Sequence, residues 1–132
     1  MIRFMRLSTK FMVVATGLLV MSPISYSDGN DLLRNCGSVE HFLNTNKMPD
    51  NAADALAFGN CASLIFGVQT TLELYNMNPQ KSPLPVCFPE GGADTVEGIQ
   101  IVSLYLRNNP ANLHEHEGLL AIKAFLDAYP CK

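Results

Sequence analysis

Residues 52–77 read AADALAFGNCASLIFGVQTTLELYNM, the longest helical pattern in the chain after the first 27 residues. Apolar side chains recur in it every three or four residues, the spacing that places them on one face of an α-helix. The predicted buried face consists of Ala57, Cys61, Leu64, Val68, Leu72 and Tyr75. Asp50 is predicted to cap this helix by accepting a hydrogen bond from a backbone amide of the first turn. The many small residues allow other helices to approach closely, so we expect this helix at the centre of the fold.

Three further segments show helical spacing, whereas alternating strand patterns are scarce. Their apolar stripes are Leu32, Cys36, Val39 and Leu43; then Val96, Ile99, Val102 and Leu106; then Leu119, Ile122, Leu126 and Tyr129. Asp94 and Glu97 have the spacing of a capping box at the start of the third helix, and Asn112 is predicted to begin the fourth. The mostly short connections favour antiparallel neighbours. The sequence therefore predicts an all-α fold.

The first 27 residues have the layout of a secretory signal peptide. Basic residues come first, the uncharged apolar run 11–21 follows, and small residues stand at Ser25 and Ser27. This pattern predicts cleavage after Ser27, which divides the chain into a signal peptide, 1–27, and one domain, 28–132. A membrane anchor is the alternative, but the run is shorter than the roughly 20 residues that span a bilayer. We therefore expect an exported, periplasmic protein with no membrane contact after cleavage.

The charge of the chain restricts its partners. It carries 9 basic and 12 acidic residues, a formal net charge of −3. Removal of residues 1–27 leaves 6 basic residues against all 12 acidic ones, a formal charge of −6. An acidic surface argues against binding to nucleic acid or to anionic lipid, and it suits a basic protein partner.

All four cysteines, Cys36, Cys61, Cys87 and Cys131, follow the predicted cleavage point. An even number in a small exported domain indicates two disulfides, and no pair has the short spacing of a zinc site. Four cysteines allow three connectivities. Helix geometry favours Cys36 with Cys61 and Cys87 with Cys131, because antiparallel helices would bring each pair to similar heights, but it leaves the other pairings open. The predicted architecture is a small four-helix bundle stapled by two disulfides.

The sequence offers little catalytic chemistry. LHEHEG is the one stretch that resembles a metal site, with His114 and His116 on either side of Glu115. Residues two apart on a helix point in different directions, and the spacing of zinc peptidases is absent. Ser63 and Ser103 lie in helical runs rather than in a strand-turn setting, and the glycines form no phosphate-binding loop. We therefore predict no enzyme activity, no metal and no cofactor.

Several segments in order resemble the Rap/Tai family of type VI secretion immunity proteins. A cysteine in the first helix is followed by GNCASLIFGV, VCFPEG, VSLYLRNNP and AIKAFLDAYPC, between about Asp31 and Cys131. The resemblance implies a small exported helical protein that binds a peptidoglycan amidase effector and blocks its active site. Some members of the family act as homodimers, so the resemblance also makes a homodimer possible. The family's positions carry over onto the four cysteines and Pro110.

Two readings of the function remain at this point. The first is the immunity protein that the resemblance implies. The alternative is a periplasmic acid-stress chaperone, which would also be small, helical and disulfide-bonded. A chaperone of this kind would expose apolar surface when acid neutralises its carboxylates, near pH 2 to 3 for groups with a pKa of about 4.

An inhibitor that blocks a cleft needs a protruding element on a rigid scaffold. The turn RNNPANLHEH, residues 107–116, is the first choice, because Pro110 stiffens it and polar side chains are concentrated in it. The predicted effector-binding residues are Arg107, Asn108, Asn109, Asn112, His114 and Glu115. The proline-rich loop Asn78–Gly92, tied through Cys87, is the second choice. An ordinary solvated connection is the alternative for both.

Overall fold

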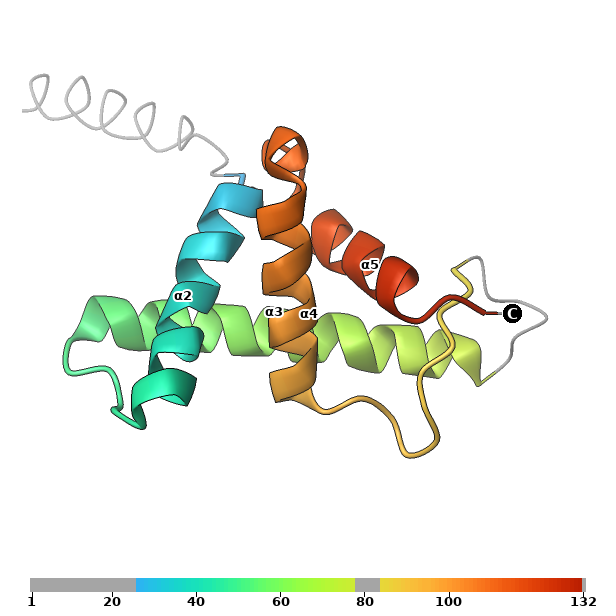
Figure 1. Ribbon diagram of the computed structural model, residues 1–132, viewed down its shortest axis with the longest axis horizontal. Coiled ribbons are helices and arrows are strands. Elements are labelled where there is room, and N and C mark those ends of the chain that lie inside the picture. Colours follow the sequence, from blue (N-terminus) through green and yellow to red (C-terminus); the bar gives the residue numbers. More distant parts are fainter. Residues whose placement is uncertain (1–25, 78–83, 132) are drawn as a thin grey trace, which may run out of the picture.

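The computed structural model describes residues 26–77 and 84–131, and this part of the chain is helical (Figure 1). It contains α2 (Gly29–Thr45), α3 (Ala52–Asn76), α4 (Thr95–Asn108), the 3₁₀ turn η1 (Pro110–Asn112) and α5 (Glu117–Ala128). The all-α prediction with four α-helices is confirmed. The predicted signal peptide lies almost wholly outside the described residues.

Side-chain caps set where the helices begin. Asp28 caps α2 by accepting hydrogen bonds from the backbone amides of Asn30 and Asp31, and the Asp31 carboxylate accepts one from the Asp28 amide. The hydrogen bond from the Asp31 amide holds the pKa of the Asp28 carboxyl below its ordinary value. Asp94 caps α4 as predicted, through the amide of Val96. The predicted return bond from Glu97 is replaced by a bond to Tyr129.

Two predicted helix starts are wrong. The cap of α3 is Asn51, whose side chain accepts from the Asp54 amide, rather than Asp50. The fourth helix begins at Glu117 rather than near Asn112, and the His116 ring caps it by accepting from the Gly118 amide. The chain needs these extra residues because η1 turns it back toward α2 before α5 begins.

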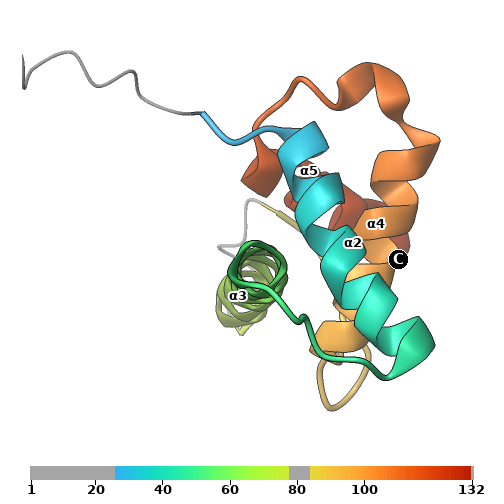
Figure 2. The same ribbon diagram turned by 90° about the vertical axis from the view of Figure 1, so that its left-hand side faces the viewer.

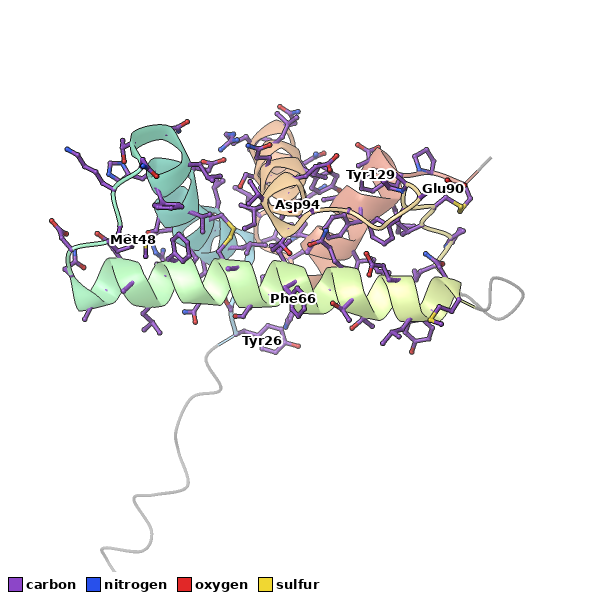
Figure 3. All side chains as sticks on the ribbon, turned by 90° about the horizontal axis from the view of Figure 1, so that it is seen from below. Tyr26, Met48, Phe66, Glu90, Asp94 and Tyr129 are labelled. Atoms are coloured by element: carbon purple, nitrogen blue, oxygen red, sulfur yellow. A yellow bond between two sulfur atoms is a disulfide. The ribbon has the colours of Figure 1, made fainter. Side chains whose placement is uncertain are left out.

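Helix α3 forms a layer of its own. Helices α2, α4 and α5 all lie across one of its sides (Figures 1 and 3), and all three contact it. In that second layer α2 and α4 run side by side in opposite directions (Figure 2). The sequence predicts antiparallel packing for helices that follow each other in the chain. Helix α3 instead crosses α2 (Figure 1), and the antiparallel pair, α2 and α4, is not consecutive. The predicted central position of α3 is wrong, because one of its sides is covered and the other is not.

The core lies between these two layers. Its fully buried large side chains come from every α-helix and, with Val86, from the loop before α4: Leu32, Cys36, Cys61, Ile65, Leu72, Val86, Ile99, Val102, Leu106, Leu120 and Phe125. The predicted stripes of α2 and α4 are largely confirmed, although Leu43 and Val96 are exposed. In α3 and α5 the buried face is rotated about the helix axis relative to the predicted apolar stripe. Helix α3 turns Ile65 and Gln69 to the core, and α5 buries Phe125 while leaving Leu119 46% exposed.

Both predicted disulfides are present, but their surroundings differ. Cys36 and Cys61 join α2 to α3 inside the core, at 1% and 0% exposure. Cys87 and Cys131 join the loop before α4 to the chain after α5, and both are exposed. A backbone hydrogen bond of 2.8 Å from the Cys87 amide to the Tyr129 carbonyl supports this second bridge. The second bridge therefore holds the end of the chain at the surface.

Under mild reducing conditions the two disulfides should be reduced one after the other. A reducing thiolate must reach a sulfur atom to attack it, so Cys87 and Cys131 should be reduced first while Cys36 and Cys61 remain oxidised in the folded protein. Timed reduction, alkylation and peptide mapping would measure this order. Equal rates for the two pairs without denaturant would contradict it, and equal rates are expected only in the unfolded control.

The Tyr129 hydroxyl should make stability depend on alkaline pH. It donates a 2.9 Å hydrogen bond to Glu97, and burial together with this bond raises the pKa of Tyr129 to about 12. Because the folded pKa exceeds the unfolded value of about 10, this group stabilises the fold below pH 10 and the contribution is lost between about pH 10 and 12. The difference in unfolding free energy between wild type and Tyr129→Phe should shrink across that window. A constant difference would contradict the assignment.

Candidate functional site

The chain between α4 and α5 forms a turn that projects from one end of the molecule (Figure 1). We call residues 107–116 the α4–α5 turn. It begins in the last residues of α4, passes through the 3₁₀ turn η1 and ends at the residue that caps α5. It lies at the end of α4 that points away from α3, beside the start of α2 (Figure 2).

The turn is held by hydrogen bonds of one side chain and of its own backbone. The side-chain amide of Asn109 donates to the backbone carbonyl of Tyr105 at 2.8 Å, at the end of α4. The backbone N–H groups of Asn112 and Glu115 then donate to the carbonyls of Asn109 and Asn112, at 3.0 and 2.9 Å. Pro110 fixes one backbone angle at the start of η1. These bonds give the turn a defined shape before any partner binds.

The start of α2 anchors the turn from outside. The Gly29 amide lies 2.9 Å from the Leu113 carbonyl and 3.1 Å from that of Glu115, and the Asn30 side chain donates to Leu113 as well. A side chain at position 29 would overlap Leu120 Cδ1 and come within 3.0 Å of the Leu113 backbone. Glycine is therefore required here because the two segments touch through their backbones.

Ion pairs occupy two of the predicted binding residues. The Arg107 guanidinium makes a bidentate contact with Glu40 of α2, with N–O distances of 2.9 to 3.0 Å. Glu115 pairs with Lys123 of α5. These pairs lie at the surface, where ion pairs contribute little to stability, but they join the turn to two helices. They hold the side chains of Arg107 and Glu115 in place within the protein itself.

The other four predicted residues divide into supporting and available groups. Asn109 is half-buried and supports the turn through its bond to Tyr105. Asn108 and His114 are exposed, and Asn112 is half-buried. His114 Nδ1 lies 3.0 Å from the Ala111 carbonyl, a contact that orients the exposed ring. The turn therefore presents polar side chains, mainly Asn108, Asn112 and His114.

Nothing in the sequence indicates the contacts that His116 and Glu117 make. The Tyr26 ring meets the His116 ring edge-on, with centroids 5.2 Å apart, and the Ser27 hydroxyl donates to Glu117 at 2.7 Å. Processing after Ser27, as the sequence predicts, would remove both contacts. No three His, Cys, Asp or Glu side chains in the described ranges are grouped so that they could hold a metal ion.

The second candidate loop lines a depression rather than a protrusion. Its described part, residues 84–92, borders an open cavity of about 610 Å³ beside the Cys87–Cys131 bridge, with Phe88 on one wall and Glu73 of α3 on another. Residues 78–83 of this predicted loop lie outside the described residues. A concave surface cannot enter the cleft of a partner, so the α4–α5 turn fits the predicted blocking role better.

A comparison with protein-family models decides the family. The model of the Rap1a immunity proteins matches residues 28–131. The chain belongs to this family. Searches of curated proteins and of solved structures gave no match. Membership confirms the resemblance seen in the sequence and implies an immunity protein that binds a cognate effector. It also favours a role without catalysis, and the disulfides and the family together point to a location outside the cytoplasm.

The anchoring of the turn on Gly29 can be tested by adding one methyl group. Gly29→Ala should lower the free energy of unfolding by about 1 to 3 kcal/mol, because the backbone of Leu113 cannot easily move away. Gly37→Ala is the matched control within the same helix, where an added Cβ meets no atom within 4 Å. That control should be neutral or stabilising by up to about 1 kcal/mol. Denaturant unfolding of both variants measures the difference, and equal effects would contradict the close approach.

Proposed function

We propose that this protein is a periplasmic immunity protein that inhibits a peptidoglycan amidase delivered by a type VI secretion system. In this proposal the α4–α5 turn enters the active-site cleft of the amidase and blocks it. The observation that carries the proposal is the family match over residues 28–131. The turn is the described element whose shape best suits a blocking role, since it is both projecting and fixed.

The fixed shape of the turn favours tight binding. Association loses affinity when flexible loops must become ordered, and a loop already held in one conformation avoids much of that loss. Here the Gly29 amide, the Asn109 side chain and the Arg107–Glu40 pair each constrain the turn. Asn108, Asn112 and His114 can then donate or accept hydrogen bonds with the polar groups of a catalytic cleft.

Charge and compartment agree with the proposal. The part of the chain after the predicted cleavage point has a formal charge of −6, which would attract a basic effector over a distance and speed association. The family match begins at Asp28, directly after that cleavage point. The disulfides suit an oxidising compartment such as the periplasm, where a peptidoglycan amidase would act. A homodimer is also part of the proposal.

Side chains of the α4–α5 turn should contribute much of the free energy of binding to the amidase. The triple variant Asn108→Ala, Asn112→Ala and His114→Ala should weaken binding to the cognate amidase about tenfold or more, because it removes the available polar groups and leaves the supporting ones. Asn109 is kept, since its side chain closes the end of α4. Binding would be measured with purified type VI amidases, including the product of any neighbouring effector gene, together with inhibition of peptidoglycan hydrolysis.

A matched control replaces the same residue types elsewhere. Asn35, His41 and Asn44 of α2 are half-buried or exposed and lie outside the turn, so their replacement by alanine should leave inhibition unchanged. Circular dichroism should show that both triple variants keep their helical content. If the turn variant folds and inhibits as well as wild type, the turn is only a connection and the contact lies elsewhere.

A further inference from the structure

The open cavity beside the Cys87–Cys131 bridge is concave, so it can receive a group from a partner. Its volume is about 610 Å³, and its walls come from the end of α3 and from the loop before α4. Met77, Val86 and Phe88 provide apolar walls, and both cysteines of the bridge line it as well. We call it the bridge cavity.

The bridge cavity is lined by one charged side chain, that of Glu73 in the last turn of α3. Glu73 is half-buried. Within residues 26–77 and 84–131, no side chain forms an ion pair with its carboxylate and no donor forms a hydrogen bond to it. A half-buried carboxylate without a partner has lost part of its hydration, and a cation that enters the cavity would replace the lost interactions.

A turn of two glycines passes close to this carboxylate. Gly91 and Gly92 have φ values of +93° and +82°, a backbone conformation that glycine adopts readily. The Gly92 amide donates to the Pro89 carbonyl at 3.0 Å, and a Cβ on Gly92 would lie 3.0 Å from Glu73 Oε1. The loop therefore comes near the carboxylate without placing a side chain over it.

Phe88 gives the same cavity a fixed aromatic surface. Its ring lies against the rings of Phe125 and Tyr129, with centroids 5.7 and 5.2 Å apart. Phe125 is fully buried, and Tyr129 is held by its hydrogen bond to Glu97. The Phe88 ring is thus in place before a ligand arrives, and an aromatic ring attracts a cation that lies within about 6 Å of its centre.

The surroundings of the bridge cavity are negative. Residues 84–106, the loop and most of α4, contain Glu90, Asp94 and Glu97 and no basic residue. Glu90 and Tyr129 lie toward the same end of the molecule (Figure 3). The chain after the predicted cleavage point also has a formal charge of −6. Such a field attracts cations and disfavours an anionic ligand.

We propose that the bridge cavity receives an arginine side chain from the surface of a protein partner. Glu73 accepts two parallel hydrogen bonds from the guanidinium group, and Phe88 stacks on its plane. The aliphatic part of the arginine packs against Met77 and Val86. Arginine suits the site better than lysine, because an ammonium group is more strongly hydrated and cannot stack on a ring in this way.

A neutral apolar ligand is the main competing occupant. It would fill the apolar walls, but it would bury Glu73 without a partner, which is unfavourable for a charged group. An arginine satisfies both the walls and the carboxylate. The site does not depend on the proposed function, because the α4–α5 turn projects from another part of the molecule than the end of the chain at Cys131 (Figure 1).

The test compares a blocked tripeptide, alanine-arginine-alanine, with the same peptide containing citrulline, which keeps the shape of arginine and lacks its charge. Titration into the oxidised, isotope-labelled protein is followed by nuclear magnetic resonance. The arginine peptide should shift the backbone amide signals of Glu73, Gly91 and Gly92. The citrulline peptide should bind about tenfold more weakly, because charge-assisted hydrogen bonds to Glu73 are lost.

Two variants separate contact with Glu73 from the general field. Glu73→Gln should weaken binding of the arginine peptide about tenfold or more and leave binding of the citrulline peptide unchanged. Glu90→Gln is the matched control, since it removes the same charge from an exposed side chain of the loop that does not line the cavity. It should weaken binding less than about threefold, because exposed charges are screened by salt.

Three results would overturn the inference. The first is equal affinity for the arginine and citrulline peptides, and the second is a Glu73→Gln variant that binds the arginine peptide like wild type. The third is a lysine tripeptide, or free arginine, that binds as tightly as the arginine tripeptide, which would contradict an arginine carried by a protein. The measurement uses no amidase, so its failure is separate from failure of inhibition by the α4–α5 turn.

Discussion

The buried Cys36–Cys61 bridge positions α2 relative to α3 and, through α2, the α4–α5 turn. It joins the middle of α2 to α3 inside the core and so fixes where the two helices cross. With α2 held there, Gly29 at its start reaches the α4–α5 turn, and Glu40 near its end reaches Arg107. A covalent bond of this kind restricts the unfolded chain by roughly 3 kcal/mol, a large share of the stability of so small a domain.

The sequence predicted where the helices lie along the chain better than it predicted which face of each helix is buried. Four helices and the cap at Asp94 follow from local patterns, because spacing and capping act between near neighbours. The two disulfides join residues 25 and 44 apart, and helix geometry favoured their pairing among three possible ones. The buried face of α3 was missed because a polar residue, Gln69, faces the core and donates to the carbonyls of Ala93 and Asp94. Gly98 provides the space for that side chain. Nothing near Gln69 in the sequence indicates this long-range contact.

The same limit applies to the site. The turn was located from Pro110 and its polar neighbours, but the sequence could not separate supporting from available side chains. Arg107 forms an ion pair with Glu40 of α2, and Glu115 forms one with Lys123 of α5. Both pairings depend on the way α2 and α5 pack against α4, which local patterns do not specify. Of the six predicted residues, Arg107, Asn109 and Glu115 support the turn through contacts within the protein, and the other three present polar groups at its surface.

The side of α3 that faces away from the other helices exposes Leu56, Phe66 and Leu74. It points away from the second layer, while the α4–α5 turn lies at the far end of α4 (Figures 1 and 2). An effector that binds the turn would therefore leave this apolar side of α3 uncovered.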